Sequence, residues 1–335
     1  MARARSARSA TPEQPVLTIE TPATRIAAEA RSALRPFLNA YWLRPENAFW
    51  MALRSAVLRQ SPVAGPSIDV SCGDGVFSFL HAGGEFSPDF DVFQAVTRLD
   101  DVHTRHADMF DGAAGDFQPQ IINPPTWRYD VGCDLKPSLL AKAARLGVYS
   151  DLKQHDNNAP LPFADGAFAT VYCNSAYWVT DIDGFLAELR RITRGDGHAI
   201  LHVKLKAMGA YTLEAHEDRL GGEFLRIIGR GRHACWPTLA TRSEWERRFD
   251  RAGFSIERAT PFISATHARV WDIGLRPIAP LLVRMANALT AENRASIKRD
   301  WVALFDALLA PLCAPDFALG EVEEEPAEIQ YLLHP

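Results

Sequence analysis

A chain of 335 residues, 47% hydrophobic and 23% charged, is long enough to bury a sizeable core and has an ordinary globular composition. A net charge of −5 without a block of lysine and arginine disfavours DNA or RNA as the main partner, so the expected substrate is a small molecule. No apolar run approaches the roughly 20 residues that cross a bilayer, and the first residues lack the apolar stretch expected of a secretory signal. Five scattered cysteines without a C-x-x-C pattern favour a reducing compartment. We therefore expect a cytoplasmic protein without a metal site.

The N-terminal part is expected to hold a tail and a helical lid. Residues 1–23 are predicted to be flexible, because the first fifteen are small, basic and interrupted by proline. Apolar residues at helical spacing over 24–62 predict two or three helices, with breaks at Pro36 and Pro45. A dense aromatic patch in this lid either packs on the core or closes over a ligand. Its members, together with one arginine, are Tyr41, Trp42, Arg44, Phe49 and Trp50.

Strands and helices then alternate along the chain. After a first strand at Ile68–Val70, further strands are predicted at Tyr129–Asp134, up to His155, and at Ala169–Asn174, Ala199–Lys204, Ser255–Thr260 and Glu328–Leu333. Helices are predicted at Pro137–Leu146, Asp181–Ile192 and Ser243–Ala252. This alternation is typical of an α/β fold with a doubly wound, mostly parallel, seven-stranded Rossmann-like sheet.

The predicted core extends over residues 63–265, with insertions at about 76–127 and 207–240. Residues 266–320 are expected to add two amphipathic helices as a cap or an interface. Residues 321–335 return to the core as its final strand.

The segment Ile68–Gly75 reads as a buried strand followed by a glycine turn that opens a helix. Glycine lets a backbone approach a ligand closely, and Asp69 and Asp74 offer acceptors at the carboxyl edge of the sheet. Two carboxylates without a lysine argue against a phosphate and favour a nucleotide-like ligand with a cationic centre. Asp134 ends the next core strand, where a carboxylate can accept from both hydroxyls of a ribose; the alternative is an N-cap of the following helix.

With these residues and the Leu-Pro-Phe-x-Asp-x-x-Phe pattern of residues 161–168, the chain resembles the class I S-adenosylmethionine-dependent methyltransferase family. The resemblance covers about residues 65–261 and the final strand. Its glycine loop has the family form D-x-G-x-G-x-G, in which Ser71 replaces the first glycine here. Asp165 and Phe168 are expected to form a turn and a core anchor.

The resemblance implies S-adenosylmethionine as the cofactor. It implies that Asp69 and the backbone of residues 73–75 face the methionine part, and that Asp156 and the amide of Asn157 contact the adenine. The implied cofactor-binding residues are Asp69, Ser71, Gly73, Gly75, Asp134, Leu135, Asp156, Asn157, Asn174 and Ser175.

The fourth core strand ends where the family commonly shows Asn-x-x-x-Glu-His, and Tyr177 and Trp178 take the place of the last two residues. Aromatic faces can stabilise a sulfonium by cation–π attraction. The alternative for Trp178 is burial beneath the following helix. A base is needed only if the nucleophile carries a proton, and its candidates are His103, His106, His202, Lys204, His216 and His233. The expected catalytic residues are Tyr177, Trp178 and His202.

The leading expectation is methyl transfer to oxygen, nitrogen or carbon of a small molecule in biosynthesis. One alternative is cyclisation of S-adenosylmethionine to azetidine-2-carboxylate and methylthioadenosine, and a second is a non-catalytic binding protein. A Rossmann dehydrogenase is disfavoured, since G-x-G-x-x-G is absent. The oligomeric state is open, with a homodimer as a candidate.

Overall fold

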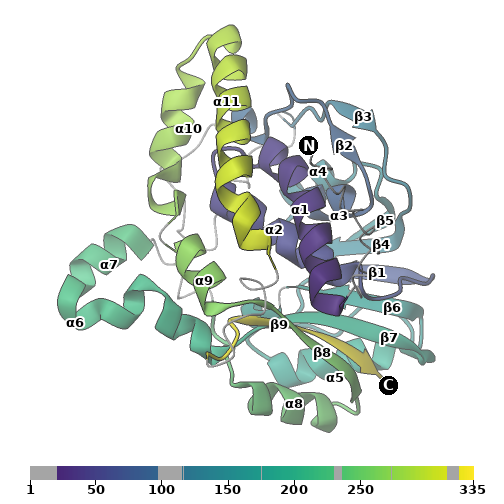
Figure 1. Ribbon diagram of the computed structural model, residues 1–335. Coiled ribbons are helices and arrows are strands. Elements are labelled where there is room, and N and C mark those ends of the chain that lie inside the picture. The colour runs from purple at the N-terminus through teal and green to yellow at the C-terminus, as the bar shows by residue number, and fades with distance from the viewer. Residues whose placement is uncertain are drawn as a thin grey trace, which may run out of the picture.

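The computed structural model describes residues 21–96, 115, 117–174, 176–229, 236–272, 274–314 and 324–335. A seven-stranded sheet runs through the middle of the molecule (Figure 1). Its strands are β1 Ser67–Val70, β4 Tyr129–Asp134, β5 Tyr149–Gln154, β6 Phe168–Cys173, β7 Thr193–Lys204, β8 Ser255–Ile263 and β9 Glu328–His334. Their order is β5-β4-β1-β6-β7-β9-β8, and β9 runs antiparallel to both of its neighbours. The predicted mostly parallel α/β sheet is confirmed.

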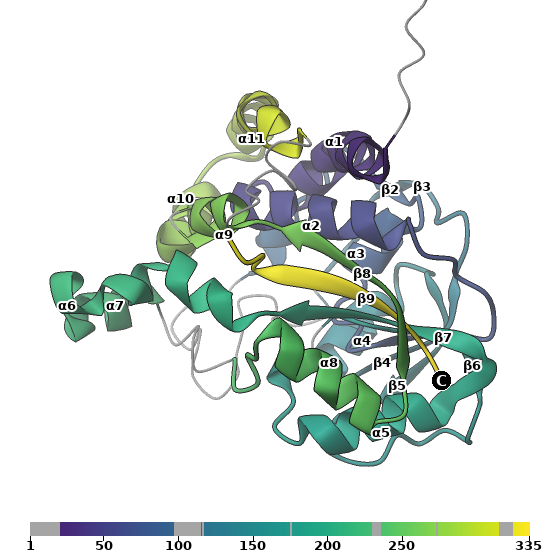
Figure 2. The same cartoon turned by 60° about the horizontal axis from the view of Figure 1, so that its bottom comes forward.

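Helices cover both faces of this sheet. Figure 2 shows α1, α2 and α3 on one side, with α5 and α8 on the other. The α-helices are α1 Pro22–Ala40, α2 Pro45–Leu58, α3 Val76–His81, α4 Pro137–Ala143, α5 Ile182–Ile192, α6 Glu217–Leu220, α7 Gly222–Gly229, α8 Arg242–Arg251, α9 Ala265–Asp272, α10 Ala279–Asn287 and α11 Ala291–Leu309. Short 3-10 helices occupy Val92–Ala95, Ala176–Trp178, Lys206–Tyr211, Leu213–His216, Arg276–Ile278 and Ala310–Cys313. Within the described part of the chain, no helix is both long enough and apolar enough to cross a membrane.

Three segments outside this sheet lie between its strands. The first contains β2 Glu85–Phe86 and β3 Ile121–Asn123, which pair antiparallel. The second contains α6 and α7, which project away from the sheet (Figure 1). The third contains α9, α10 and α11, three α-helices where the sequence predicts two.

The N-terminal lid consists of two helices, and Pro45 begins the second as predicted. The predicted break at Pro36 is wrong, because α1 continues through this residue. Proline removes the N–H that would bond the carbonyl of Ser32. Pro36 and Ser32 both lie on the exposed side of α1, so water can bond that carbonyl and the helix is not interrupted.

The two faces of the sheet differ in polarity. Successive side chains of a strand point to opposite faces, so each strand contributes to both layers. The face towards α5 and α8 is apolar and includes Ile68, Val70, Val171, Leu201, Val203 and Ile329. The face towards α2 and α3 carries buried polar groups, among them Asp69, His202, Glu328 and Gln330. A buried polar group needs partners, and α2 and α3 supply them.

Candidate functional site

The turn between β1 and α3 has the geometry of a ligand-binding loop. Ser71, Gly73 and Gly75 have φ values of 66°, 61° and 76°, all in the left-handed region that favours glycine. A Cβ at Gly73 would meet nothing within 4 Å, whereas one at Gly75 would lie 3.1 Å from both Ala143 and Tyr149. Gly75 is therefore required by packing, and Gly73 leaves its backbone open to a ligand.

Ser71 holds the left-handed conformation without being glycine, which costs about 1–2 kcal/mol. Its Oγ accepts a hydrogen bond from Asn157 Nδ2 at 2.7 Å. This contact ties the loop after β1 to the segment that follows β5. The departure from the family pattern thus adds a link between two predicted binding segments.

Asp69 lies beneath this loop and is buried. Its Oδ2 accepts from the hydroxyls of Ser78 at 2.6 Å and Tyr149 at 2.7 Å. Its Oδ1 has no hydrogen-bond partner within the described part of the chain. Burial raises the pKa of this carboxyl to about 6, against the hydrogen bonds from Ser78 and Tyr149, which lower it. A buried carboxylate oxygen without a donor fits a cationic N–H group such as the ammonium of S-adenosylmethionine.

Asp134 joins the end of β4 to the glycine loop. Its Oδ2 accepts from the amide of Gly73 at 3.0 Å, and its Oδ1 from the amide of Lys136 at 2.9 Å. The N-cap of α4 is Lys136, so the alternative role of Asp134 as N-cap is wrong. The following residue, Leu135, is 53% exposed beside it.

The other predicted cofactor residues lie at the same edge of the sheet. Strands β5, β4, β1 and β6 are adjacent and parallel, so the segments after their carboxyl ends come together. Asp156 is exposed after β5, and its Oδ1 accepts from the amide and the side chain of Asn158, both at 3.0 Å. Asn174 is half-buried after β6, while Ser175 lies outside the described residues.

The predicted aromatic pair follows β6 in the 3-10 helix Ala176–Trp178. Trp178 is 43% exposed, so its alternative burial beneath α5 is wrong. The backbone of Tyr177 belongs to this turn, but its side chain lies outside the described part of the structure. Contact of either ring with a sulfonium stays a prediction.

His202 lies on β7, fully buried against α2. The amide nitrogen of Gln330 donates to Val57 O and Ser61 Oγ, which leaves its oxygen to accept from His202 Nε2 at 2.7 Å. This network assigns the proton to Nε2, so Nδ1 accepts from the Tyr172 hydroxyl at 3.3 Å. Burial lowers the pKa of His202 to about 3. The ring is neutral at pH 7 with both nitrogens engaged, which argues against a role as base.

The other residues considered as a general base lie in different parts of the chain. His103, His106 and His233 lie outside the described residues, and His216 is exposed in the insertion after β7. Lys204 is buried at the carboxyl end of β7.

Lys204 belongs to a buried charged cluster that the sequence did not reveal. The carboxylate of Glu328 accepts from Trp50 Nε1 at 2.7 Å and Arg54 Nη2 at 3.0 Å, and lies 3.3 Å from Lys204 Nζ. Burial alone would raise the pKa of Glu328, but Arg54 and Lys204 lower it to about 2. The ammonium of Lys204 also lies 4.5 Å from the ring centre of Trp50. The sequence signal that could have indicated this cluster is Glu328, a charged residue at the start of the largely apolar final strand.

The aromatic patch of the lid packs into the core. Tyr41, Trp42, Arg44, Phe49 and Trp50 are all buried. Trp42 meets Trp301 of α11 edge-to-face at 6.3 Å, and Phe49 meets His267 of α9 at 5.3 Å. These contacts agree with the interpretation that the patch packs on the core. Contact of the patch with a substrate stays a prediction.

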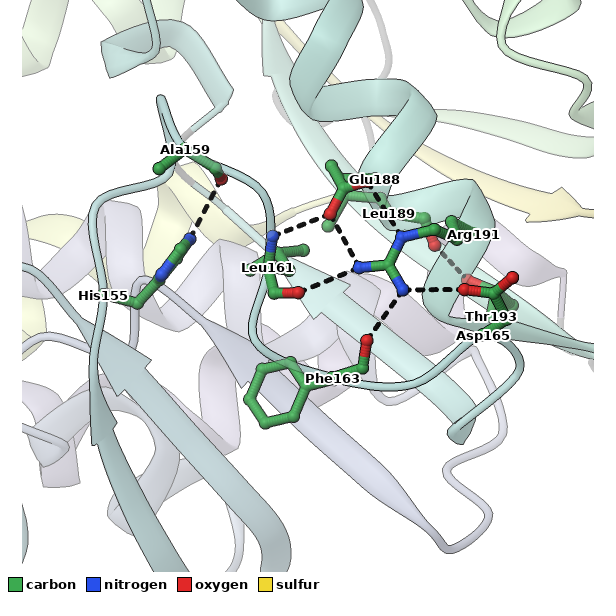
Figure 3. Close-up of polar contacts among 9 residues, drawn as sticks. All are labelled: His155, Ala159, Leu161, Phe163, Asp165, Glu188, Leu189, Arg191 and Thr193. Carbon is green, nitrogen blue, oxygen red and sulfur yellow. Dashed lines mark hydrogen bonds and ion pairs between the residues drawn. The ribbon is translucent and has the colours of Figure 1, made fainter.

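The segment of residues 161–168 is held by one arginine of α5 (Figure 3). Arg191 donates to Phe163 O at 2.7 Å, Leu161 O at 2.8 Å and Asp165 Oδ1 at 2.9 Å. Glu188 accepts from the same guanidinium and from the amide of Leu161. Asp165 therefore has the structural role expected of it.

Comparison with known families gives a match in this region: residues 123–201 match the family described as methyltransferase domain. This part of the chain, which contains β4, β5 and β6, is therefore similar to a methyltransferase domain. Its cofactor is S-adenosylmethionine, which Asp69 and the glycine loop fit chemically. No curated protein matches the chain.

Solved structures similar to this chain include three with distant sequences. One is an S-adenosylmethionine-dependent methyltransferase from Mesorhizobium loti, with 14% identity, a TM-score of 0.44, and coverage of 85% of this chain and 97% of that one. A putative methyltransferase from Haloferax volcanii, in complex with its Trm112 activator, has 14% identity, a TM-score of 0.44 and coverage of 92% and 96%. A possible histamine N-methyltransferase from Thermotoga maritima has 12% identity, a TM-score of 0.39 and coverage of 71% and 77%.

Proposed function

We propose that the protein transfers the methyl group of S-adenosylmethionine to an oxygen, nitrogen or carbon atom of a small molecule in a biosynthetic reaction. The observation that most supports this is the linkage of three segments at one sheet edge. The amide of Gly73, in the loop after β1, donates a hydrogen bond to Asp134 at the end of β4 at 3.0 Å. Asn157, in the segment after β5, donates one to Ser71 Oγ of the same loop at 2.7 Å. When bound, the cofactor supplies an electrophilic methyl group on a sulfonium that leaves readily.

Within this proposal, three carboxylates hold the cofactor. The Oδ1 of Asp69 accepts from the ammonium group, since it has no other hydrogen-bond partner among the described residues. Asp134 accepts from the ribose hydroxyls, because each carboxylate oxygen has lone pairs for more than one hydrogen bond. Asp156, exposed beside them, accepts from the adenine amino group.

Orientation and exclusion of water are the proposed catalytic contributions of the chain itself. The exposed ring of Trp178 and the neighbouring Tyr177 would offer aromatic faces to the sulfonium without acting as nucleophiles. His202 would act as a positioning residue, since its neutral ring holds the hydroxyl of Tyr172 just before the end of β6. A neutral, fully bonded histidine has no means of taking a proton from the substrate.

The remaining parts of the proposal concern location and assembly. Four of the five cysteines are free thiols buried in the structure, which supports a cytoplasmic location. A net charge of −5 supports a small molecule over a nucleic acid. A homodimer stays a prediction, and analytical ultracentrifugation tests it.

The test of the proposed function is the fate of the cofactor. The purified protein is incubated with S-adenosylmethionine, with and without a small-molecule cell extract, and the adenosyl product is identified by mass spectrometry. S-adenosylhomocysteine that depends on the extract is the expected result. Methylthioadenosine without extract would favour cyclisation instead, and binding with neither product would favour a non-catalytic protein. The variant Trp178→Leu should lower the rate, whereas Trp178→Phe should retain most of it.

A further inference from the structure

A cavity of about 520 Å³ opens at the amino ends of β1 and β4. It lies between the end of α2, the linker to β1, the turn after α3 and the start of β4. Ser67 and Arg128 line it, whereas the glycine loop and Asp134 follow the other ends of the same strands. Since a strand rises about 3.3 Å per residue, the cavity and the cofactor edge are about 13 Å apart along β1, from Ser67 to Ser71, and about 20 Å apart along β4, from Arg128 to Asp134. Its volume is within the range of small-molecule sites.

Two guanidinium groups border this cavity. Arg128 is exposed and makes no hydrogen bond or ion pair with the described residues. Arg59 shares an exposed pair with Glu29 at 2.9 Å. The lining carboxylate of Asp130 already accepts from the amide and hydroxyl of Ser67, at 2.7 and 3.1 Å. Arg59 is balanced by Glu29, so Arg128 is the guanidinium at which this rim favours an anion, and guanidinium groups bind carboxylates in a planar, bidentate manner.

The inner wall is apolar and aromatic. Trp127 is half-buried and meets His81 edge-to-face at 5.7 Å, while Leu58 and Val63 add aliphatic surface. These side chains suit a flat ring that stacks on an indole.

His81 adds one polar contact to this wall. It is 5% exposed, and its Nδ1 is engaged with the Ser55 hydroxyl at 3.0 Å. Its Nε2 has no hydrogen-bond partner among the described residues, so this nitrogen is left for a ligand. Burial lowers the pKa of His81 to about 3, so the ring is neutral and can bond a polar ring atom.

We propose that this cavity is a second ligand site of the protein, separate from the cofactor edge, which binds a small planar ring acid. The carboxylate pairs with Arg128 and Arg59, the ring stacks on Trp127, and a ring heteroatom bonds His81 Nε2. Such a ligand leaves the methyl-transfer edge free, so it is not the methyl acceptor.

The probe for this site is 5-fluoronicotinate, which combines a planar ring, a ring nitrogen and a carboxylate. Its binding to the full chain is followed by ¹⁹F NMR line broadening, and 5-fluoronicotinamide serves as the uncharged control. We expect a Kd of about 1 mM or tighter for the acid, and binding of the amide weaker by about fivefold or more. The cofactor should not displace the probe, since the two sites lie at opposite ends of the strands.

Two charge-reversal variants test whether the acid binds in this cavity. Arg128→Glu should weaken binding of the acid by about tenfold, whereas Arg247→Glu, an exposed arginine on α8, should leave it unchanged. Both side chains are exposed, so both variants should keep the thermal midpoint of the wild type. Absence of binding, equal effects of the two variants, equal binding of acid and amide, or displacement by S-adenosylmethionine would each overturn the proposal. Failure of methyl transfer would not affect this readout.

Discussion

Replacement of Glu328 by glutamine tests the buried charged cluster at nearly constant side-chain volume. The wild-type carboxylate accepts from Trp50 and Arg54 and pairs with Lys204, all three of them buried. The variant would leave the two cations buried without this counter-charge. Loss of one partner of a buried ion pair costs about 3–5 kcal/mol of unfolding free energy.

The pKa shift of Glu328 gives a similar value for the contribution of its charge to the free energy of unfolding. Burial raises its pKa, but Arg54 and Lys204 outweigh burial and lower it from 4.5 to about 2. A difference of this size corresponds to about 3 kcal/mol, at about 1.4 kcal/mol for each unit of pKa. Because the folded state holds the proton less tightly than the unfolded state, this stabilisation is present above pH 4.5 and is lost as the pH falls towards 2.

The assay is urea unfolding followed by circular dichroism at pH 7 and at pH 3. The matched control is Glu29→Gln, which removes an exposed pair with Arg59 and should cost less than about 1 kcal/mol. The destabilisation by Glu328→Gln should fall to less than half between pH 7 and pH 3. A loss at pH 7 no larger than that of the control, or one that does not shrink at pH 3, would refute the reasoning.

Three further predictions concern the cofactor edge. Asp134→Ala should weaken S-adenosylmethionine binding by about 1.5–3 kcal/mol in calorimetry, whereas the exposed Asp151→Ala should not; unchanged affinity would remove Asp134 from the site. Gly75→Ala should lower the thermal midpoint more than Gly147→Ala, because both have positive φ but only the Cβ at Gly75 would meet atoms at 3.1 Å; equal losses would contradict this. Since burial raises the pKa of Asp69 to about 6, cofactor affinity should fall as the pH drops from 7 to 5; calorimetry should show this fall in the wild type and not in Asp69→Asn.

Local sequence patterns predicted much of the backbone. The strand Tyr129–Asp134 has the predicted bounds, and Asp181 caps the helix that follows β6. Both features depend on residues that are close in the chain. The strand forms from residues that favour β structure, and the helix begins where the carboxylate of Asp181 accepts from the amide of Gly184. The glycine loop was also predictable, because left-handed φ values favour glycine.

Other features depend on residues far apart in the chain. The break predicted at Pro36 is absent because the freed carbonyl faces water, which neighbouring residues alone do not determine. Local sequence is compatible with both burial and exposure of Trp178, and the structure leaves this side chain 43% exposed. The neutrality of His202 results from complete burial and from the charge of Arg54 on α2, which together lower its pKa.

The sequence by itself determined the alternation of strands and helices, the glycine loop and the carboxylates that follow the core strands. These follow from periodicity and from conformational preferences that act over a few residues. Only the tertiary structure decided that the last strand lies between β7 and β8, which places Glu328 against Arg54 of α2, 274 residues away. It also decided which polar groups are buried and therefore which pKa values depart from their ordinary range. The physical reason is that burial and long-range pairing depend on the packing of whole elements, and no local pattern contains that information.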